Sequence, residues 1–218
     1  MRLAITQRVV ENESYPERRD CLSQEWPEFV SNAIPTSILL PVPNQLEGAA
    51  AWAEEANIDG LILSGGNDWG DAPERDRTEA ALFAYCRAAG LPILGTCRGI
   101  QAVNLLLGGS IEGDLQQHTA IRHVARCHRI HLHLGVFEAL AGGDELTVNS
   151  YHNQGIVAEG VAESCFVFAT ADDDIVEGIC HRNEPVLALQ WHPERTGSVL
   201  AFDTAVIERL FAEGAFWL

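Results

Sequence analysis

The sequence predicts an α/β fold in which helices flank a mostly parallel central sheet, with an additional small antiparallel element. Strand-like and helix-like segments alternate along the first half of the chain, which is typical of βαβ units with parallel strands. Hydrophobic residues make up 47% of the 218 residues, so the chain can bury a sizeable core. The sequence contains no repeat and no linker-like stretch, and we therefore expect residues 1–218 to form a single domain.

The first half of the chain predicts strands and helices in alternation. Strands are expected at Leu3–Thr6, Thr36–Val42, Asp59–Ser64 and Ile93–Thr96, and helices over Asn44–Asn57, Pro73–Ala89 and Arg98–Leu107. Asn44 is a suitable N-cap for the first of these helices, and Gly90 with Pro92 marks the end of the second. Helices of this length are long enough for right-handed crossovers between parallel strands.

The second half of the chain has a less regular pattern. Strands are expected at Ile130–Leu134, Cys165–Ala171, Ile175–His181 and Pro185–Trp191, and a final helix over Thr196–Ala212. The turn at residues 182–184 predicts that the last two strands form an antiparallel pair.

The charge and composition exclude several classes of function. A net charge of −17 argues against binding to nucleic acid or to anionic membranes. All 14 basic residues are arginine, which excludes chemistry that needs a lysine. The six cysteines have no metal-ligand spacing, so we expect reduced thiols and no metal site. We see neither a membrane-spanning run nor a signal peptide, and we expect a cytoplasmic protein.

Cys97 lies in a pattern that favours a nucleophile. The strand before it ends in Gly95-Thr96-Cys97-Arg98-Gly99, and a helix follows at once, which is the arrangement of a nucleophile elbow. The helix N-terminus favours the thiolate, and the backbone N–H of Arg98 can hold an oxyanion. The alternative is a buried cysteine in an ordinary strand-to-helix turn.

A second motif supplies the partners that a cysteine nucleophile needs. His192 and Glu194 are two residues apart, so their side chains face the same way in an extended chain. They follow an apolar strand, which would place them at the same sheet edge as Cys97. The combination predicts a Cys-His-Glu triad.

The segments LSGG (Leu63–Gly66), GTCRGIQ and WHPE, in this order along the chain, resemble the class I glutamine amidotransferases. More closely, they resemble the free-standing γ-glutamyl hydrolase branch of that family, and the similarity spans roughly residues 59–197. The resemblance implies a flavodoxin-like fold of this family. It also implies hydrolysis of a γ-glutamyl C–N bond through a γ-glutamyl thioester, without a metal or cofactor.

The resemblance implies a role for each matching residue. Cys97 would be the nucleophile, His192 the acid and base, and Glu194 the residue that orients it. The backbone N–H groups of Gly66 and Arg98 would form the oxyanion hole. The glutamyl group would be held by Gln101, Ser150, Tyr151 and His152, although the last three also fit an ordinary polar loop.

A basic segment bears on the leaving group. Residues 115–137 contain three arginines and five histidines but no acidic residue. We hypothesise that Arg122 and Arg129 meet an anionic, phosphate-bearing leaving group, since arginine favours phosphate contacts. The alternative is a solvated strand pair whose arginines bridge an acidic surface. The shared face of His131 and His133 offers a metal site that we do not favour.

The N-terminal segment, residues 5–26, resembles proteins of phosphoramidate decoration of bacterial surface polysaccharides. In those pathways a γ-glutamyl phosphoramidate of cytidine diphosphate is cleaved to glutamate and cytidine diphosphoramidate. Our first hypothesis is therefore a hydrolase of this kind. The alternatives are a hydrolase of γ-glutamyl amines such as γ-glutamyl-γ-aminobutyrate, a glutaminase that works with a synthase partner, and an inactive binding protein. The sequence also leaves a homodimer open.

Overall fold

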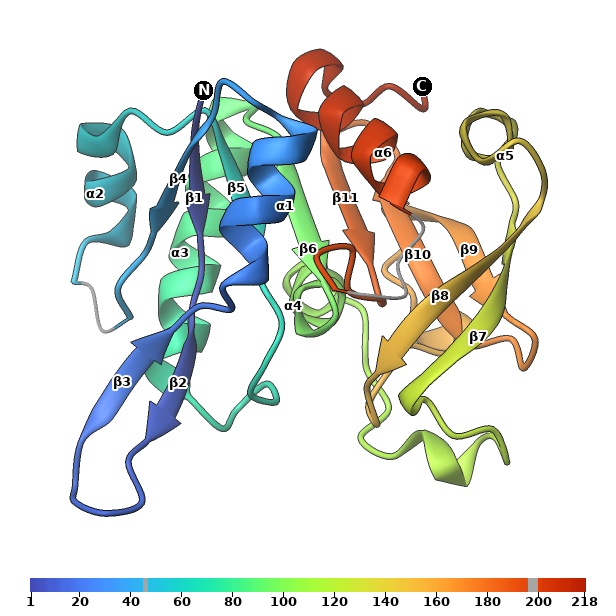
Figure 1. The fold of residues 1–218 in the computed structure, drawn as a ribbon, viewed down its shortest axis with the longest axis horizontal. Coiled ribbons are helices and arrows are strands. Elements are labelled where there is room, and N and C mark those ends of the chain that lie inside the picture. Colours follow the sequence, from blue (N-terminus) through green and yellow to red (C-terminus); the bar gives the residue numbers. More distant parts are fainter. Residues whose placement is uncertain (45–46, 196–199) are drawn as a thin grey trace.

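The computed structural model describes residues 1–44, 47–195 and 200–218. Within these residues, nine strands form one mixed sheet in the order β4-β1-β5-β6-β11-β10-β9-β7-β8 (Figure 1). The parallel part consists of β1 (Arg2–Ile5), β4 (Ile38–Pro41), β5 (Gly60–Leu63), β6 (Ile93–Thr96) and β11 (Val186–Leu189). The antiparallel part adds β7 (Val124–Leu132), β8 (Glu145–Tyr151), β9 (Cys165–Ala171) and β10 (Val176–His181). The α/β prediction with a mostly parallel centre is confirmed.

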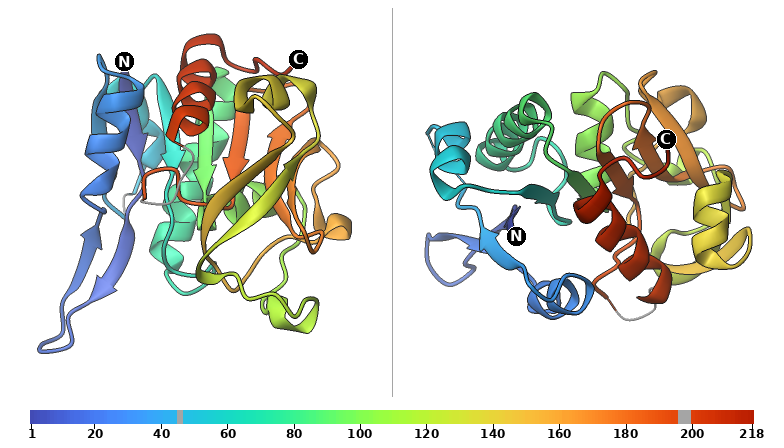
Figure 2. Two further views of the ribbon diagram at one scale, coloured as in Figure 1. Left: turned by 45° about the vertical axis from the view of Figure 1, so that its right-hand side comes forward. Right: turned by 90° about the horizontal axis from the view of Figure 1, so that it is seen from above.

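Helices cover both faces of this sheet (Figure 2). One face carries α1 (Glu25–Ala33), α5 (Gly135–Ala141) and α6 (Leu200–Glu213), and the other carries α2 (Ala49–Ala56), α3 (Pro73–Ala89) and α4 (Arg98–Leu106). Short 3₁₀ turns occupy Leu115–Gln117 and Ala158–Gly160. Each face has its own apolar layer, because the central parallel strands β5, β6 and β11 are buried on both sides.

Several elements have the bounds that the sequence predicts. The helix α3 spans Pro73–Ala89, and Gly90 ends it with a left-handed backbone. The strands β6 and β9 also match their predicted ranges. The predicted antiparallel pair is confirmed, since β10 pairs with β11 through Gly178 and Leu189.

The segment between β1 and β4 was not predicted. It forms a small antiparallel hairpin of β2 (Arg8–Glu11) and β3 (Arg18–Cys21), followed by α1. The strand β3 is polar and mostly exposed, and β2 has two adjacent valines between charged residues, so neither strand has the apolar alternation that marks a strand. The helix α1 does carry a period, because Trp26, Phe29, Val30 and Ala33 are its buried residues.

The helix α2 begins later than the sequence predicts. Gly48, not Asn44, precedes its first residue, Ala49. The backbone N–H and side-chain amide of Asn44 instead donate to the carboxylate of Asp20. The prediction of Asn44 as N-cap is therefore wrong, because Asn44 donates its hydrogen bonds to Asp20 of the hairpin instead. Residues 45–46 of the predicted helix, and residues 196–199 of the predicted last helix, lie outside the described residues.

The strand β8 and the helix α5 were also missed, because residues 135–151 mix short polar and apolar stretches without a sustained period. That residues 1–218 form one domain stays a prediction. In the described ranges, the structure contains no helix with the length and apolar character required to span a membrane.

The indole N–H of Trp191 donates to Asp203 Oδ1 at 2.9 Å, which joins the end of β11 to α6. Both side chains are fully buried. We expect Asp203→Ala to lower the free energy of unfolding by about 1–3 kcal/mol, because it leaves a buried donor without its acceptor. Glu208 is exposed in the same helix, and Glu208→Ala is therefore the matched control. Urea unfolding measures both, and equal stability of the two variants would contradict the expectation.

Candidate active site

The pairing of β6 with β11 brings the two sequence motifs to one edge of the sheet. The strands run parallel with Thr96 opposite Leu189, and the N–H of Cys97 donates to the Leu189 carbonyl at 2.8 Å. Cys97 directly follows β6, and His192 lies three residues after the end of β11. Both side chains pack around Gly65, where an added Cβ would lie 3.4 Å from Cys97 Cβ and 2.7 Å from His192 Cε1. The nucleophile candidate and the base candidate are therefore neighbours.

The glycines on either side of Cys97 are required by close approaches of the backbone. A Cβ on Gly99 would lie 2.1 Å from the carbonyl oxygen of Leu63, and a Cβ on Gly95 would lie 2.6 Å from the carbonyl oxygen of Gly99. Cys97 itself has φ 53° and ψ −107°, a conformation that non-glycine residues rarely adopt. Such strain is typical of functional sites, and here it holds the thiol at the start of α4.

His192 is held firmly in one orientation. Its Nδ1 lies 2.7 Å from Glu194 Oε1, and both side chains are buried. The side chain of Asn149 bridges the backbone of His192, accepting from its N–H at 2.9 Å and donating to its carbonyl at 2.8 Å. Burial lowers the pKa of His192, but hydrogen bonds to Cys97 and Glu194 and the charges of both raise it, to about 9. The imidazole is therefore poised to carry a proton beside the thiol.

A cavity of about 440 Å³ opens above Cys97. Seven of the predicted site residues line it: Gly66, Cys97, Arg98, Gln101, Tyr151, His152 and His192. Glu194 lies behind His192, where an orienting carboxylate belongs. The size suits a small-molecule site.

A buried ionic network supports the loop at Gly66. The guanidinium of Arg75 donates to the carbonyls of Ser64, Gly65 and Gly66 at 2.6, 3.2 and 2.5 Å. Because C=O and N–H of a trans peptide point in opposite directions, the Gly66 N–H faces away from Arg75. This orientation is compatible with a hydrogen bond from Gly66 to an oxyanion.

The same network fixes the side chain of Arg98. Glu79 accepts from Arg75 at 2.8 Å and also binds Arg98, and Arg98 Nη2 lies 2.5 Å from Asp76 Oδ1. Burial raises the pKa of Glu79, but the charges and hydrogen bonds of both arginines bring it below its usual value. The side chain of Arg98 is held there, and its backbone N–H lies at the first residue of α4, directly after Cys97.

The candidate glutamyl contacts fall in two groups. Gln101, Tyr151 and His152 line the cavity, and Gln101 Nε2 donates to the Gln154 carbonyl at 3.0 Å. The side chain of Ser150 is buried and donates to the carbonyl of His123, so it is not part of the cavity wall.

The structure does not bring Arg122 or Arg129 into the cavity. Arg129 is exposed and pairs with Asp172 at 3.1 Å and Glu145 at 3.6 Å. Arg122 is exposed as well. The basic segment itself contains no acidic residue. In the folded chain, however, β8 and β9 pair with β7 and bring carboxylates beside it.

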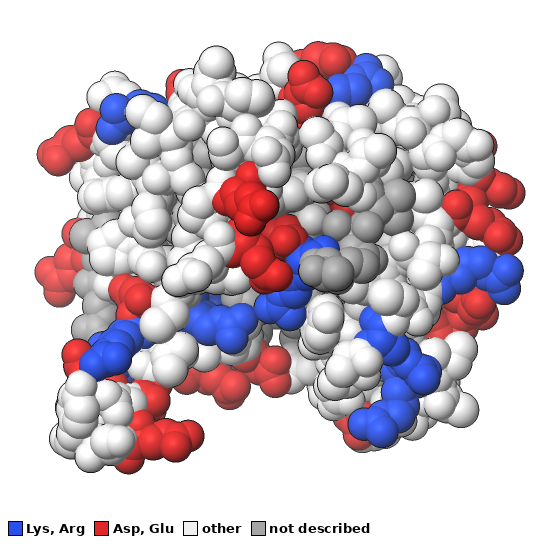
Figure 3. All heavy atoms as spheres, in the orientation of Figure 1, with Lys and Arg blue, Asp and Glu red and all other residues white. Residues whose placement is uncertain are grey.

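Other charged residues of the cavity were missed. Arg8 comes from β2, Arg195 follows Glu194, and Asp68 lies just after the Gly65-Gly66 turn. Arg195 packs over the ring of Tyr151 at 4.8 Å. Figure 3 shows arginine side chains gathered around the hollow on this face, in a chain with net charge −17. No local pattern marks them, since each lies in a polar stretch that only the fold brings to the site.

Residues 3–194 match the peptidase C26 family model, and the chain belongs to this family, which is class I glutamine amidotransferase-like. A γ-glutamyl-CDP-amidate hydrolase of Campylobacter jejuni is 28% identical, and the match covers 89% of this chain and 90% of that protein. A glutamine amidotransferase-like protein of Lactococcus lactis is 33% identical, with 72% and 74% covered.

Solved structures agree with the fold. The structure of a GMP synthase component from Thermoplasma acidophilum superposes with a TM-score of 0.72, 18% identity and coverage of 98% of this chain and 94% of that chain. At this identity the likeness establishes the fold alone. The family and the fold together define a class I amidotransferase-type hydrolase that acts on glutamine or γ-glutamyl amides.

We expect Gly99→Ala to shift α4 away from β5, because the new methyl group would overlap the Leu63 carbonyl. The free energy of unfolding should fall by about 1–3 kcal/mol, and hydrolysis should fall at least about tenfold. Gly113→Ala is the matched control, since nothing lies within 4 Å of its added Cβ. Thermal unfolding and a glutamate-release assay measure both, and unchanged behaviour of Gly99→Ala would contradict the packing argument.

The raised pKa of His192 sets an alkaline limit for activity. The imidazolium exists below its pKa of about 9 and is lost as the pH rises through that value, so kcat/KM should fall there. Glu194→Gln removes the charge at Nδ1 and should move this fall to lower pH. The pH profiles of the wild type and the variant test this, and an identical alkaline limb in both would show that Glu194 does not set it.

Proposed function

We propose that the chain hydrolyses a γ-glutamyl amide through a thioester on Cys97. The observation that carries the proposal is the buried His192–Glu194 pair, 2.7 Å apart, beside a cysteine in a strained elbow. Acyl transfer of this kind requires a nucleophile, a base beside it and a carboxylate that orients the base.

The proposed reaction proceeds in two steps. Cys97 Sγ attacks the γ-carbonyl carbon as a thiolate paired with the imidazolium of His192, and the N–H groups of Gly66 and Arg98 hold the oxyanion. His192 gives its proton to the leaving nitrogen as the C–N bond breaks, which leaves a γ-glutamyl thioester. His192 then takes a proton from water, the hydroxide attacks the thioester, and the C–S bond breaks to release glutamate.

The cavity offers suitable groups for the glutamyl part of the substrate. Asp68 contributes a carboxylate, which suits the α-ammonium group, and its Oδ2 accepts from Gln154 at 2.9 Å. Burial and the nearby Asp71 raise the pKa of Asp68, so a bound cation would stabilise its charged form. Gln101 and the backbone of residues 150–152 complete this subsite in our proposal.

For the leaving group we propose an anion of the nucleotide phosphoramidate class. The best candidate is γ-glutamyl-CDP-amidate, cleaved to CDP-amidate and glutamate in surface-polysaccharide synthesis. Arg8 and Arg195 line the cavity and supply positive charge for phosphate groups. The Campylobacter jejuni relative, whose name gives this activity, aligns with most of both chains.

Two other functions remain alternatives. A γ-glutamyl-γ-aminobutyrate-type hydrolase would use the same triad with an amine leaving group. A glutaminase subunit would need a synthase partner, and the name of the Thermoplasma acidophilum structure gives it as part of a GMP synthase. The cytoplasmic location and the homodimer stay predictions.

The substrate is tested by glutamate release from glutamine, γ-glutamyl-γ-aminobutyrate and γ-glutamyl-CDP-amidate, offered to the purified chain side by side. We expect the nucleotide to have the highest kcat/KM, and Cys97→Ser to abolish turnover. Arg8→Ala and Arg195→Ala should raise KM for the nucleotide by about 10-fold each, as expected for a lost charged contact worth roughly 1.4 kcal/mol, without raising it for glutamine.

Arg129→Ala is the matched control, because Arg129 pairs with Asp172 outside the cavity. An equal loss in this variant would contradict the assignment of Arg8 and Arg195. Preference for γ-glutamyl-γ-aminobutyrate would support the amine alternative, and turnover that appears only with a synthase partner would support the glutaminase alternative.

A further inference from the structure

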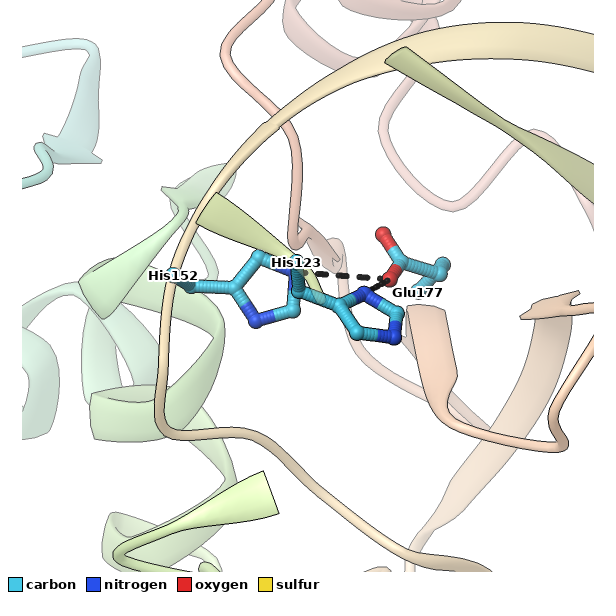
Figure 4. Close-up of side chains that lie close together, drawn as sticks. All are labelled: His123, His152 and Glu177. Atoms are coloured by element: carbon cyan, nitrogen blue, oxygen red, sulfur yellow. Dashed lines mark ion pairs between the residues drawn. The ribbon is translucent and has the colours of Figure 1, made fainter. Parts of the chain in front are cut away.

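Three histidines surround one carboxylate beside the candidate active site. His123 precedes β7, His128 lies within it, His152 follows β8, and Glu177 lies in β10. Figure 4 shows the rings of His123 and His152 directed at the carboxylate of Glu177. His123, His152 and Glu177 are all buried, and their potential ligand atoms lie within 4.8 Å of one another.

The contacts in this cluster do not have the geometry of hydrogen bonds. Glu177 Oε1 lies 3.6 Å from His123 Nδ1, 3.3 Å from His128 Nε2 and 3.4 Å from His152 Nε2. In the described part of the chain, none of these four atoms has a hydrogen-bond partner. Two ligands of a tetrahedral zinc ion, each about 2.0–2.1 Å from the metal, are separated by about 3.3 Å. The distances from Glu177 Oε1 to these nitrogens are therefore close to those of atoms that share an ion.

The opposite nitrogen of two of the rings has a hydrogen-bond acceptor. His123 Nε2 lies 3.0 Å from Asp173 Oδ2, and His152 Nδ1 lies 2.9 Å from the Gln154 carbonyl. In a neutral imidazole each acceptor fixes the proton on that nitrogen, and the other nitrogen then has a lone pair toward Glu177. A carboxylate or carbonyl behind the imidazole is the usual arrangement for histidines that bind metal.

Lone pairs on His123, His152 and Glu177 therefore face one another, which is unfavourable unless a cation lies between them. One proton could bridge only one nitrogen to Oε1, and three imidazolium ions would place excess positive charge in a buried site. A divalent ion contacts all the ligands at once, and the carboxylates of Glu177 and Asp173 match its charge.

We propose that His123 Nδ1, His152 Nε2 and Glu177 Oε1 bind a zinc ion, with a water molecule as the fourth ligand. Imidazole-rich sets suit zinc among the common divalent ions, and zinc takes four ligands in a tetrahedron. The proposed ion takes no part in the thioester chemistry. It ties β7, β8 and β10 together beside the cavity.

The proposed ion would also hold residues of the substrate cavity in place. The Gln154 carbonyl accepts from both His152 Nδ1 and Gln101 Nε2, at 2.9 and 3.0 Å. An ion on His152 therefore fixes the carbonyl that orients Gln101. This consequence rests on the proposed function, and it means that loss of the ion should raise KM for glutamyl substrates more than it lowers kcat.

The test measures metal directly, using the full chain without a histidine tag. After incubation with zinc sulfate and dialysis, elemental analysis should find one zinc per chain. Glu177→Gln and His123→Ala should lose it, whereas Asp173→Asn should weaken binding by about 10–100-fold through the outer partner of His123. The exposed His133→Ala is the matched control and should retain the ion. Cobalt substituted for zinc should give the visible absorption of a tetrahedral site.

Circular dichroism separates lost binding from failure to fold, and Asp173→Asn keeps the test informative if Glu177→Gln does not fold. A folded wild-type chain that retains no zinc or cobalt would overturn the proposal. Equal zinc content in the wild type and a folded Glu177→Gln would also overturn it. Since metal content is measured without a substrate, failure of the proposed function would not affect this result.

Discussion

The parallel pairing of β6 with β11 is the constraint on which the candidate site depends. The hydrogen bond from Cys97 N to the Leu189 carbonyl, at 2.8 Å, fixes where each strand ends relative to the other. Both motifs leave the sheet at its carboxyl edge, which is where open α/β sheets place their ligands. A slip of one residue in this register would turn the side chains to the opposite face and separate Cys97 from His192.

The surroundings of the triad come from both parts of the sheet. On the parallel side, Arg75 holds the carbonyls of the Gly65-Gly66 turn, and Glu79 joins Arg75 to Arg98. On the antiparallel side, Asn149 in β8 binds the backbone of His192. Such buried polar groups are costly unless every partner is present, so they favour one arrangement of the cavity.

The sequence predicted the triad and part of the cavity wall, but not the charged residues Arg8, Asp68 and Arg195 that also line the cavity. Cys97, His192 and Glu194 lie in short motifs directly after apolar strands, so parallel pairing alone predicts that they meet. Arg8 and Asp68 reach the cavity through the hairpin and a loop, for which no apolar period exists.

The error at Arg129 has the same physical origin as the missed cluster at Glu177. Asp172 lies in a turn 43 residues after Arg129, and Glu177 lies in the strand that follows. Only the antiparallel half of the sheet brings them beside the basic segment. Charge along the chain predicts a local field only where no neighbouring strand supplies the opposite charge.

The most direct measurement is to trap the acyl-enzyme. The purified chain would be mixed with a γ-glutamyl substrate, quenched in acid within one turnover, digested and examined by mass spectrometry. We expect the peptide that contains Cys97 to carry a glutamyl group, and hydroxylamine to release it as the hydroxamate. Hydrolysis that continues in Cys97→Ala, or a glutamyl group on another residue, would contradict the thioester mechanism.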